Sequence, residues 1–162
     1  ATAGSVELRD WSENIKQPLG LSKQYEKAAN NAKQLSKTLG DMELNFVGHS
    51  LGGGEAALNS LVTSNDKLKG RKAFTFNAAG VSDLTKIKEG TWKTPFKSEK
   101  KIEAYILRTD PLNILQNRSP AMPDVNGNRH YLSPKDLPSV YNGHSIDNNI
   151  KNFGVNPDKY KK

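Results

Sequence analysis

The sequence contains no cysteine, so it can form neither a disulfide framework nor a thiolate metal site. Catalysis by a cysteine nucleophile is excluded for the same reason. No segment approaches the roughly 18 consecutive apolar residues that a membrane-spanning helix requires. The first residues, starting at Ala1, also lack the basic, apolar and small-residue zones of a secretory signal peptide. The chain as given is therefore expected to be soluble.

Apolar residues are also scarce, at 35% of the chain, while charged residues make up 25%. They nevertheless cluster in short blocks, which indicates a folded domain with extensive polar loops. A chain of 162 residues is the usual size of one domain, and no internal repeat or change of composition divides it. We therefore expect a single domain that spans residues 1–162.

Acidic residues are fewer than basic ones, 17 against 24, which gives a formal net charge of +7. This balance favours anionic partners such as phospholipid headgroups or nucleic acid, and charge alone does not choose between them. The sequence has no nucleic-acid-binding motif and no stripe of alternating basic and aromatic residues, so a nucleic-acid partner is not expected. Four lysines at spaced positions are typical of the solvated face of a helix: Lys23, Lys27, Lys33 and Lys37.

The pattern along the chain alternates between strands and helices. A helix is expected from Leu21 to Leu39, with Ser22 as its cap and Gly40 as its stop. Short apolar blocks predict strands at 43–48, 72–77 and 102–107, and a helix should follow the first strand at 51–61. We expect a loop with a short helix at 1–20, long proline-rich loops at 111–143, and a final helix from about Ser145 to Phe153.

Strands separated by helical segments predict an α/β fold with a parallel sheet and flanking helices. The ligand site of such a fold lies at the carboxyl ends of the strands. Ser50, Asn77 and Asp110 all follow predicted strands directly. These side chains are therefore expected to meet at one edge of the sheet.

Ser50 lies in the motif Gly48-His49-Ser50-Leu51-Gly52, between a predicted strand and a predicted helix. In this context Gly-x-Ser-x-Gly forms a sharp turn that lifts the serine hydroxyl above the sheet, and its small flanking residues relieve crowding. A Gly-rich turn with no catalytic role is the alternative. The motif together with its context favours Ser50 as a nucleophile.

A nucleophilic serine needs a histidine to accept its proton, and the sequence offers three. His49 lies inside the turn, so its ring should point away from the hydroxyl and pack or form hydrogen bonds. His130 and His144 both follow the serine in the order that this fold uses. His144 is favoured because it lies at a loop-to-helix junction, and His130 stays the alternative.

The histidine in turn needs a carboxylate to fix its tautomer. Asp110 follows the third strand, and Pro111 restricts its backbone to an extended geometry, so it presents its carboxylate rigidly. Asp124, in a proline-rich loop, and Asp147, three residues beyond His144, are weaker candidates. An ordinary Asp-Pro turn is the alternative for Asp110.

An acyl-transfer site also needs donors for the oxyanion of the tetrahedral intermediate. The backbone amide of Leu51, at the start of the helix, is the expected first donor. The second donor must come from an earlier loop, and Thr2 is the best residue available for it. The sequence indicates no cofactor and no metal ligand set.

Three segments together resemble class 3 lipases, which include fungal triacylglycerol lipases and bacterial phospholipase A1-like proteins. They are Val47-Gly48-His49-Ser50-Leu51-Gly52-Gly53-Gly54, Phe76-Asn77-Ala78-Ala79-Gly80 and Arg108-Thr109-Asp110-Pro111-Leu112. The resemblance implies an α/β-hydrolase fold with Ser50 as nucleophile, Asp110 as acid and His144 as base. The opening Ala1-Thr2-Ala3-Gly4 also resembles the oxyanion loop of this family. This resemblance implies that Thr2 occupies the oxyanion position, although Ala1 stands where the family usually has glycine.

The strands that this family places before the oxyanion loop have no counterpart in the chain. The resemblance therefore implies a catalytic domain that corresponds to the carboxyl-terminal two-thirds of the fold. The expected substrates are carboxylic esters of lipids or phospholipids, and an anionic membrane surface is an expected partner. A secreted or effector-type protein is expected rather than a cytoplasmic one, and the sequence leaves its oligomeric state open.

Two other functions compete with a lipase or phospholipase. One is a soluble esterase or thioesterase with small substrates, because no long apolar lid segment is present. The other is a lipase-like binding module with weak catalysis, which the absent strands and the incomplete oxyanion site suggest. The candidate set Ser50, Asp110 and His144 argues against a pure binding module.

Overall fold

The computed structural model of the chain describes residues 18–64, 70–91, 99–119, 122–133, 144, 145 and 150, of which 18–22 and 70 are described by their backbone alone. Its described elements follow the chain in the order α2 (Pro18–Leu39), β1 (Leu44–His49), α3 (Leu51–Thr63), β2 (Gly70–Phe76), α4 (Asp83–Lys88), β3 (Ile102–Leu107), α6 (Pro111–Arg118) and β4 (Asn128–Leu132). In the described part of the chain no helix is long and apolar enough to cross a membrane.

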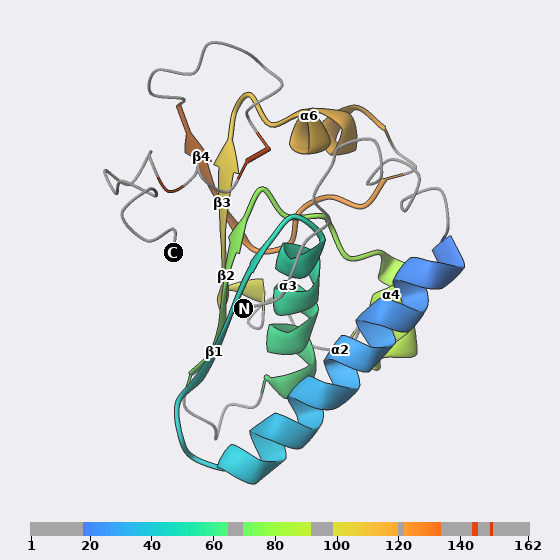
Figure 1. Cartoon of the computed structure of the whole chain (residues 1–162), viewed down its shortest axis with the longest axis vertical. Coiled ribbons are helices and arrows are strands. Elements are labelled where there is room, and N and C mark those ends of the chain that lie inside the picture. Colours follow the sequence, from blue (N-terminus) through green and yellow to red (C-terminus); the bar gives the residue numbers. More distant parts are fainter. Residues whose placement is uncertain are drawn as a thin grey trace, which may run out of the picture.

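The four described strands form one parallel sheet in the order β1-β2-β3-β4. Helices α2 and α3 lie on one side of this sheet, and α6 lies beyond the carboxyl end of β3 (Figure 1). Each strand follows its neighbour along the chain through a segment that crosses over the sheet, as parallel pairing requires. The expected α/β class, a parallel sheet with flanking helices, is confirmed.

The register of the sheet aligns the carboxyl ends of its strands. His49 pairs with Phe76, Phe76 with Tyr105, and Tyr105 with His130. The residues that follow this row, Ser50 and Asn77, therefore lie on the same edge of the sheet. This edge carries the candidate site.

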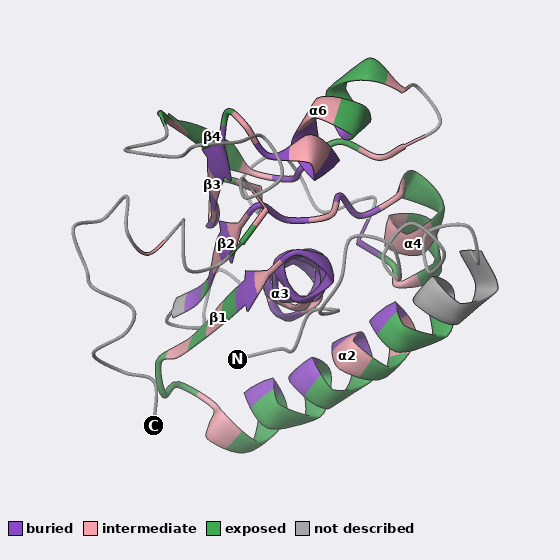
Figure 2. Cartoon of the chain, turned by 45° about the horizontal axis from the view of Figure 1, so that its top comes forward, coloured by how far each residue is buried: buried purple, intermediate pink, exposed green. Residues whose placement is uncertain are grey.

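Helix α3 is the centre of the hydrophobic core. Figure 2 shows it buried on nearly every side, whereas α2 buries only one stripe. Leu58 and Ala56 of α3 are fully buried together with Ala73 of β2 and Ile102 of β3. A helix that is apolar and buried all round packs between other elements, here between the sheet and α2.

Helix α2 begins at Pro18, four residues before the predicted cap Ser22, so that cap assignment is wrong. Proline suits the first turn of a helix because its missing N–H would have no partner there. At the other end, Gly40 adopts φ +52°, the left-handed conformation expected of the residue that stops a helix.

The lysines of α2 are exposed, as predicted for a solvated face: Lys23, Lys27, Lys33 and Lys37. The opposite face buries side chains three or four residues apart, among them Tyr25, Ala29 and Ala32. This face packs against α3.

Arg71 of β2 binds the carboxyl end of α2. Its guanidinium donates to the backbone carbonyls of Met42 at 2.5 Å, Gly40 at 2.7 Å and Ser36 at 3.3 Å. The side chain is fully buried. It thereby satisfies carbonyls that a helix end leaves without partners and joins α2 to the sheet.

The prediction of long loops over 111–143 is wrong for two parts of that segment. Residues Pro111–Arg118 form α6, because Asp110 caps the helix and Pro111 occupies its first position. Residues Asn128–Leu132 form β4, whose only described neighbour in the sheet is β3. The two predicted helices at the chain ends, near 1–20 and 145–153, fall almost entirely outside the described residues.

Candidate active site

Ser50 occupies a sharp turn between β1 and α3. Its backbone adopts φ 57° and ψ −126°, which a non-glycine residue rarely does. Strain of this kind costs about 1–3 kcal/mol and persists only when surrounding contacts enforce it. Here the Ser50 amide donates to the Phe76 carbonyl at 3.1 Å, and the Ser50 carbonyl accepts from the Ala79 amide at 2.9 Å.

Two glycines of the motif are required by close packing around this turn. A Cβ atom at Gly48 would collide with the backbone of Gly52. A Cβ atom at Gly53 would lie 2.6 Å from the Cβ of Ala78. The spacing of small residues around Ser50 thus follows from how closely the turn packs on the ends of β1 and β2.

Ser50, His144 and Asp110 form a continuous hydrogen-bonded chain. The Ser50 Oγ lies 2.8 Å from the His144 Nε2, and the His144 Nδ1 lies 2.7 Å from the Asp110 Oδ1. Ser50 and Asp110 are fully buried, and the His144 side chain is 12% exposed. Because a carboxylate only accepts, Nδ1 carries the proton and Nε2 of the neutral ring accepts from the hydroxyl.

Asp110 is held by the first turn of α6 as well as by His144. Its carboxylate accepts from the backbone amides of Leu112 at 3.3 Å and Asn113 at 3.1 Å, and from the Asn113 side-chain amide. These hydrogen bonds cap the amino end of α6 and fix the orientation of the carboxylate. Asn113, which is 3% exposed, is a further residue of the site that the sequence pattern did not predict. The sequence could have indicated it, because it lies three residues after Asp110, the cap of α6.

The other two histidines make different contacts. The His49 Nε2 contacts the backbone oxygen of His144 at 2.6 Å, in line with the expected hydrogen-bonding role. His130 lies on β4, where its Nε2 is 2.5 Å from the Glu103 Oε2 and its ring stacks on Tyr105. The structure therefore brings His144, not His130, to Ser50.

The alternative acids are also separate from this chain of hydrogen bonds. Asp124 lies 3.4 Å from Arg129 and its side chain is 59% exposed. Asp147 falls outside the described residues. Among the carboxylates of the described residues, Asp110 is the one with a hydrogen bond to His144.

Leu51 is the first residue of α3 and is buried beside Ser50. An amide at this position has no acceptor within its own helix, so it is available to an anion at the turn. Thr2, the other predicted oxyanion donor, falls outside the described residues.

Asn77 joins the end of β2 to the end of β3. Its backbone, at φ 43°, leaves the strand, and its amide donates to the Tyr105 carbonyl at 2.9 Å. Its side-chain oxygen accepts from the Leu107 amide at 2.9 Å. The Asn77 side chain thus accepts a hydrogen bond from the neighbouring strand, as a backbone carbonyl would, while the main chain turns toward Ser50.

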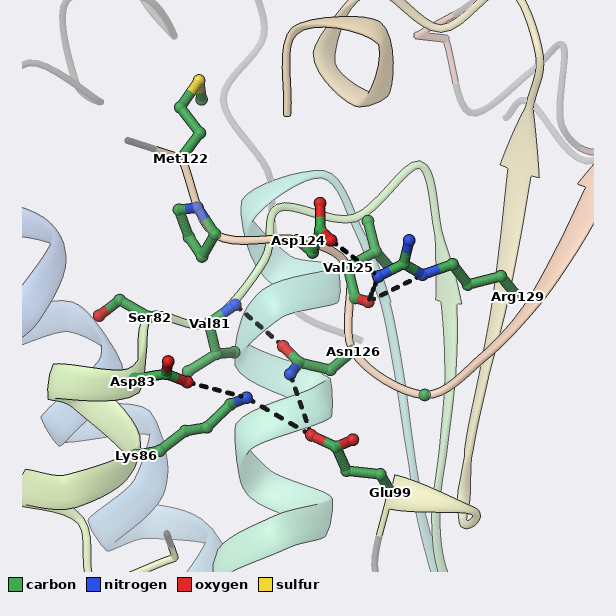
Figure 3. Close-up of a pocket in the computed structure, with 12 residues that line it drawn as sticks. Val81, Ser82, Asp83, Lys86, Glu99, Met122, Asp124, Val125, Asn126 and Arg129 are labelled. Atoms are coloured by element: carbon green, nitrogen blue, oxygen red, sulfur yellow. Dashed lines mark hydrogen bonds and ion pairs between the residues drawn. The ribbon is translucent and has the colours of Figure 1, made fainter. Parts of the chain in front are cut away.

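A polar hollow of about 450 Å³ lies between α4 and the segment 122–127 (Figure 3). The Lys86 Nζ lies 3.5 Å from Asp83 and 3.4 Å from Glu99, which also accepts from the Asn126 amide at 3.3 Å. These side chains contact one another across the hollow, and no residue of the Ser50–His144–Asp110 chain lines it. We interpret it as a junction between elements.

Within the described ranges, no three His, Asp or Glu side chains are grouped so that they could hold a metal ion. The edge of the sheet holds a buried serine, a histidine and a carboxylate joined by hydrogen bonds. Such a set can transfer a proton from the serine hydroxyl and support nucleophilic attack on an acyl group.

The amino-acid sequence is similar to a known protein family and to a known phospholipase. Residues 1–156 match the phospholipase-like family described as "Tle-like phospholipase domain". The chain is 38% identical over 142 residues to an extracellular phospholipase A1 of Serratia liquefaciens. The match covers 84% of this chain and 42% of that relative, so the chain spans less than half of the relative's length.

Proposed function

The chain belongs to the family of Tle-like phospholipase domains, a family of lipid ester hydrolases, and on this basis we propose that it cleaves acyl esters of phospholipids with Ser50 as the nucleophile. The observation that carries the proposal is the hydrogen-bonded chain from Ser50 through His144 to Asp110. The name of the relative, extracellular phospholipase A1, supports a phospholipid as the substrate.

In the acylation step, the Ser50 Oγ attacks the ester carbonyl while its proton passes to the His144 Nε2. The carbonyl oxygen becomes an oxyanion, which the Leu51 amide stabilises, and Thr2 is the proposed second donor. The intermediate then expels the lysophospholipid alkoxide, which takes the proton from His144. Asp110 stabilises the imidazolium that exists between these transfers.

Deacylation repeats the sequence with water. His144 removes a proton from a water molecule, which attacks the acyl group on Ser50, and the returned proton restores the serine hydroxyl. The products are a fatty acid and a lysophospholipid. The full burial of Ser50 and Asp110 strengthens each electrostatic contact of the cycle.

The experiment that tests the proposal measures fatty-acid release from phospholipid micelles by the wild type and by Ser50→Ala. We expect the variant to fold, because the contacts that enforce the strained turn are made by the backbone of residue 50 and not by its hydroxyl. It should lose at least about 10³-fold in turnover. A folded variant that keeps a tenth of wild-type turnover contradicts the assignment. Activity on soluble monomeric esters with no rise above the micelle threshold would instead favour a small-substrate esterase.

The formal charge of +7 supports an anionic membrane surface as the place of action. The relative is named extracellular, which supports secretion or delivery outside the producing cell. Assay of the culture medium and the cell fraction of the native producer for this chain tests the location, and recovery in the cytosol alone contradicts it.

A further inference from the structure

His49 has no role in the reaction proposed above, although it lies beside the nucleophile. It is the last residue of β1 and directly precedes Ser50. The Nε2 of its ring lies 2.6 Å from the backbone oxygen of His144. The two imidazole rings are 5.0 Å apart between centroids and inclined by 45°.

The protonation of His49 follows from this contact. A carbonyl oxygen only accepts, so the His49 Nε2 must carry the proton. Burial lowers the pKa of His49, and the neighbouring His144 ring lowers it further. The ring is therefore neutral at neutral pH, and a neutral donor does not oppose the positive charge that His144 acquires when it accepts a proton.

Two other described contacts of His144 involve its side chain and not its backbone. Ser50 and Asp110 hold its two ring nitrogens, and both contacts act on the side chain. The hydrogen bond from His49 acts on the main chain, and it comes from the strand that ends at the nucleophile. One rigid element thus fixes both Ser50 and the backbone of the residue that must accept its proton.

We propose that His49 is a positioning residue, which holds the backbone of His144 so that the His144 Nε2 stays within hydrogen-bonding distance of the Ser50 Oγ. This inference rests on the proposed function. Displacement of a reacting group by about 1 Å can cost 10²-fold in rate. Loss of the hydrogen bond between His49 and the His144 backbone should therefore reduce turnover and leave substrate binding almost unchanged.

Two substitutions distinguish the hydrogen bond from His49 to the His144 backbone from other roles of the ring. His49→Leu removes the donor, whereas His49→Gln places an amide nitrogen near the position of Nε2. On phosphatidylcholine micelles we expect His49→Leu to lower kcat by about 100-fold with KM within about twofold, and His49→Gln to return kcat to within about fivefold of wild type. His49→Asn, whose amide nitrogen is one bond short, should resemble His49→Leu.

His130→Leu is the matched control, because it removes a histidine from the same register row without touching His144. Its kcat should equal that of the wild type. Circular dichroism and Tm establish that each variant is folded, and the Gln and Asn variants carry the comparison if His49→Leu does not fold.

Three outcomes overturn the proposal: near-wild-type kcat in His49→Leu, a folded His49→Gln as inactive as the Leu and Asn variants, or an effect confined to KM. Failure of the proposed function gives a different result, since Ser50→Ala would then remain active. The failure of the positioning role and the failure of the proposed function can therefore be told apart.

Discussion

Asp110 contributes to both structure and the candidate chemistry through a single carboxylate. It caps α6 through two backbone amides and contacts the His144 Nδ1 from the same group. Asparagine also caps helices well, but its amide can present an N–H to the histidine instead of an acceptor. The two contributions can therefore be separated by one substitution.

Asp110→Asn should keep the fold and lower turnover by roughly 10⁴-fold at neutral pH, because the amide stabilises the wrong tautomer of His144. Asp124→Asn is the control and should be nearly silent, since Asp124 is exposed and pairs with Arg129. The measurement is kcat on phospholipid micelles, with circular dichroism of both variants. An active Asp110→Asn beside an inactive Asp124→Asn would reverse the assignment.

At the scale of elements, two buried charged residues connect α2 to the rest of the fold. Arg71 binds the carboxyl end of α2, and Glu55 of α3 faces α2 near Gln24. Glu55 is 2% exposed. Substitution of each residue is expected to change the thermal stability of the protein in a different way.

Arg71→Met should destabilise the protein, because it removes the buried guanidinium that donates to the carbonyls of Ser36, Gly40 and Met42. The expected cost is about 3 kcal/mol, or a fall in Tm of roughly 6–12 °C for a domain of this size. Thermal unfolding measures it, and the exposed Arg118→Met should change Tm little. An unchanged Tm in Arg71→Met would show that the guanidinium is dispensable as a cap.

Burial raises the pKa of Glu55 above its usual value of 4.5, against a smaller opposite effect of the hydrogen bond with Gln24. The folded state then binds the proton more tightly than the unfolded state. Its stabilising contribution is present below about pH 4.5 and is lost as the pH rises through the raised pKa.

Glu55→Gln should therefore have a higher Tm than the wild type near neutral pH, and the difference should shrink toward about pH 4. Tm measured across this range tests it, with the exposed Glu43→Gln as the control. A Glu55→Gln variant with a lower Tm at neutral pH would mean that the carboxylate is stabilised by its surroundings.

At the scale of the whole molecule, the order of strands and helices can be predicted from the sequence. It depends on short apolar blocks and on the glycines around Ser50, which are patterns within single segments of the chain. Ser50, Asp110 and His144 were selected in the same way, each beside a strand or helix end. The helix α6 and the strand β4 were missed because the many prolines of 111–143 indicate loops, whereas Pro111 starts a helix. The role of Arg71 was not predictable, because its acceptors lie about thirty residues away in α2 and after it.

The net charge of +7 predicts a binding preference for vesicles that contain anionic lipid. The Ser50→Ala variant should bind vesicles that contain anionic lipid more tightly than phosphatidylcholine vesicles. Because screening shortens the reach of charge to about 8 Å at physiological ionic strength, the preference should fade between about 50 mM and about 500 mM salt. Vesicle sedimentation measures this, and equal binding to both lipids at low salt would exclude an electrostatic contribution.

The most direct test of the central claim is labelling with a fluorophosphonate, which reacts with a serine activated by its base and oxyanion donors. Peptide mass spectrometry should find one adduct, on Ser50. His144→Ala should abolish it, whereas His130→Ala should leave it intact. A wild type that is folded and unlabelled, or an adduct on another residue, would contradict Ser50 as the activated nucleophile.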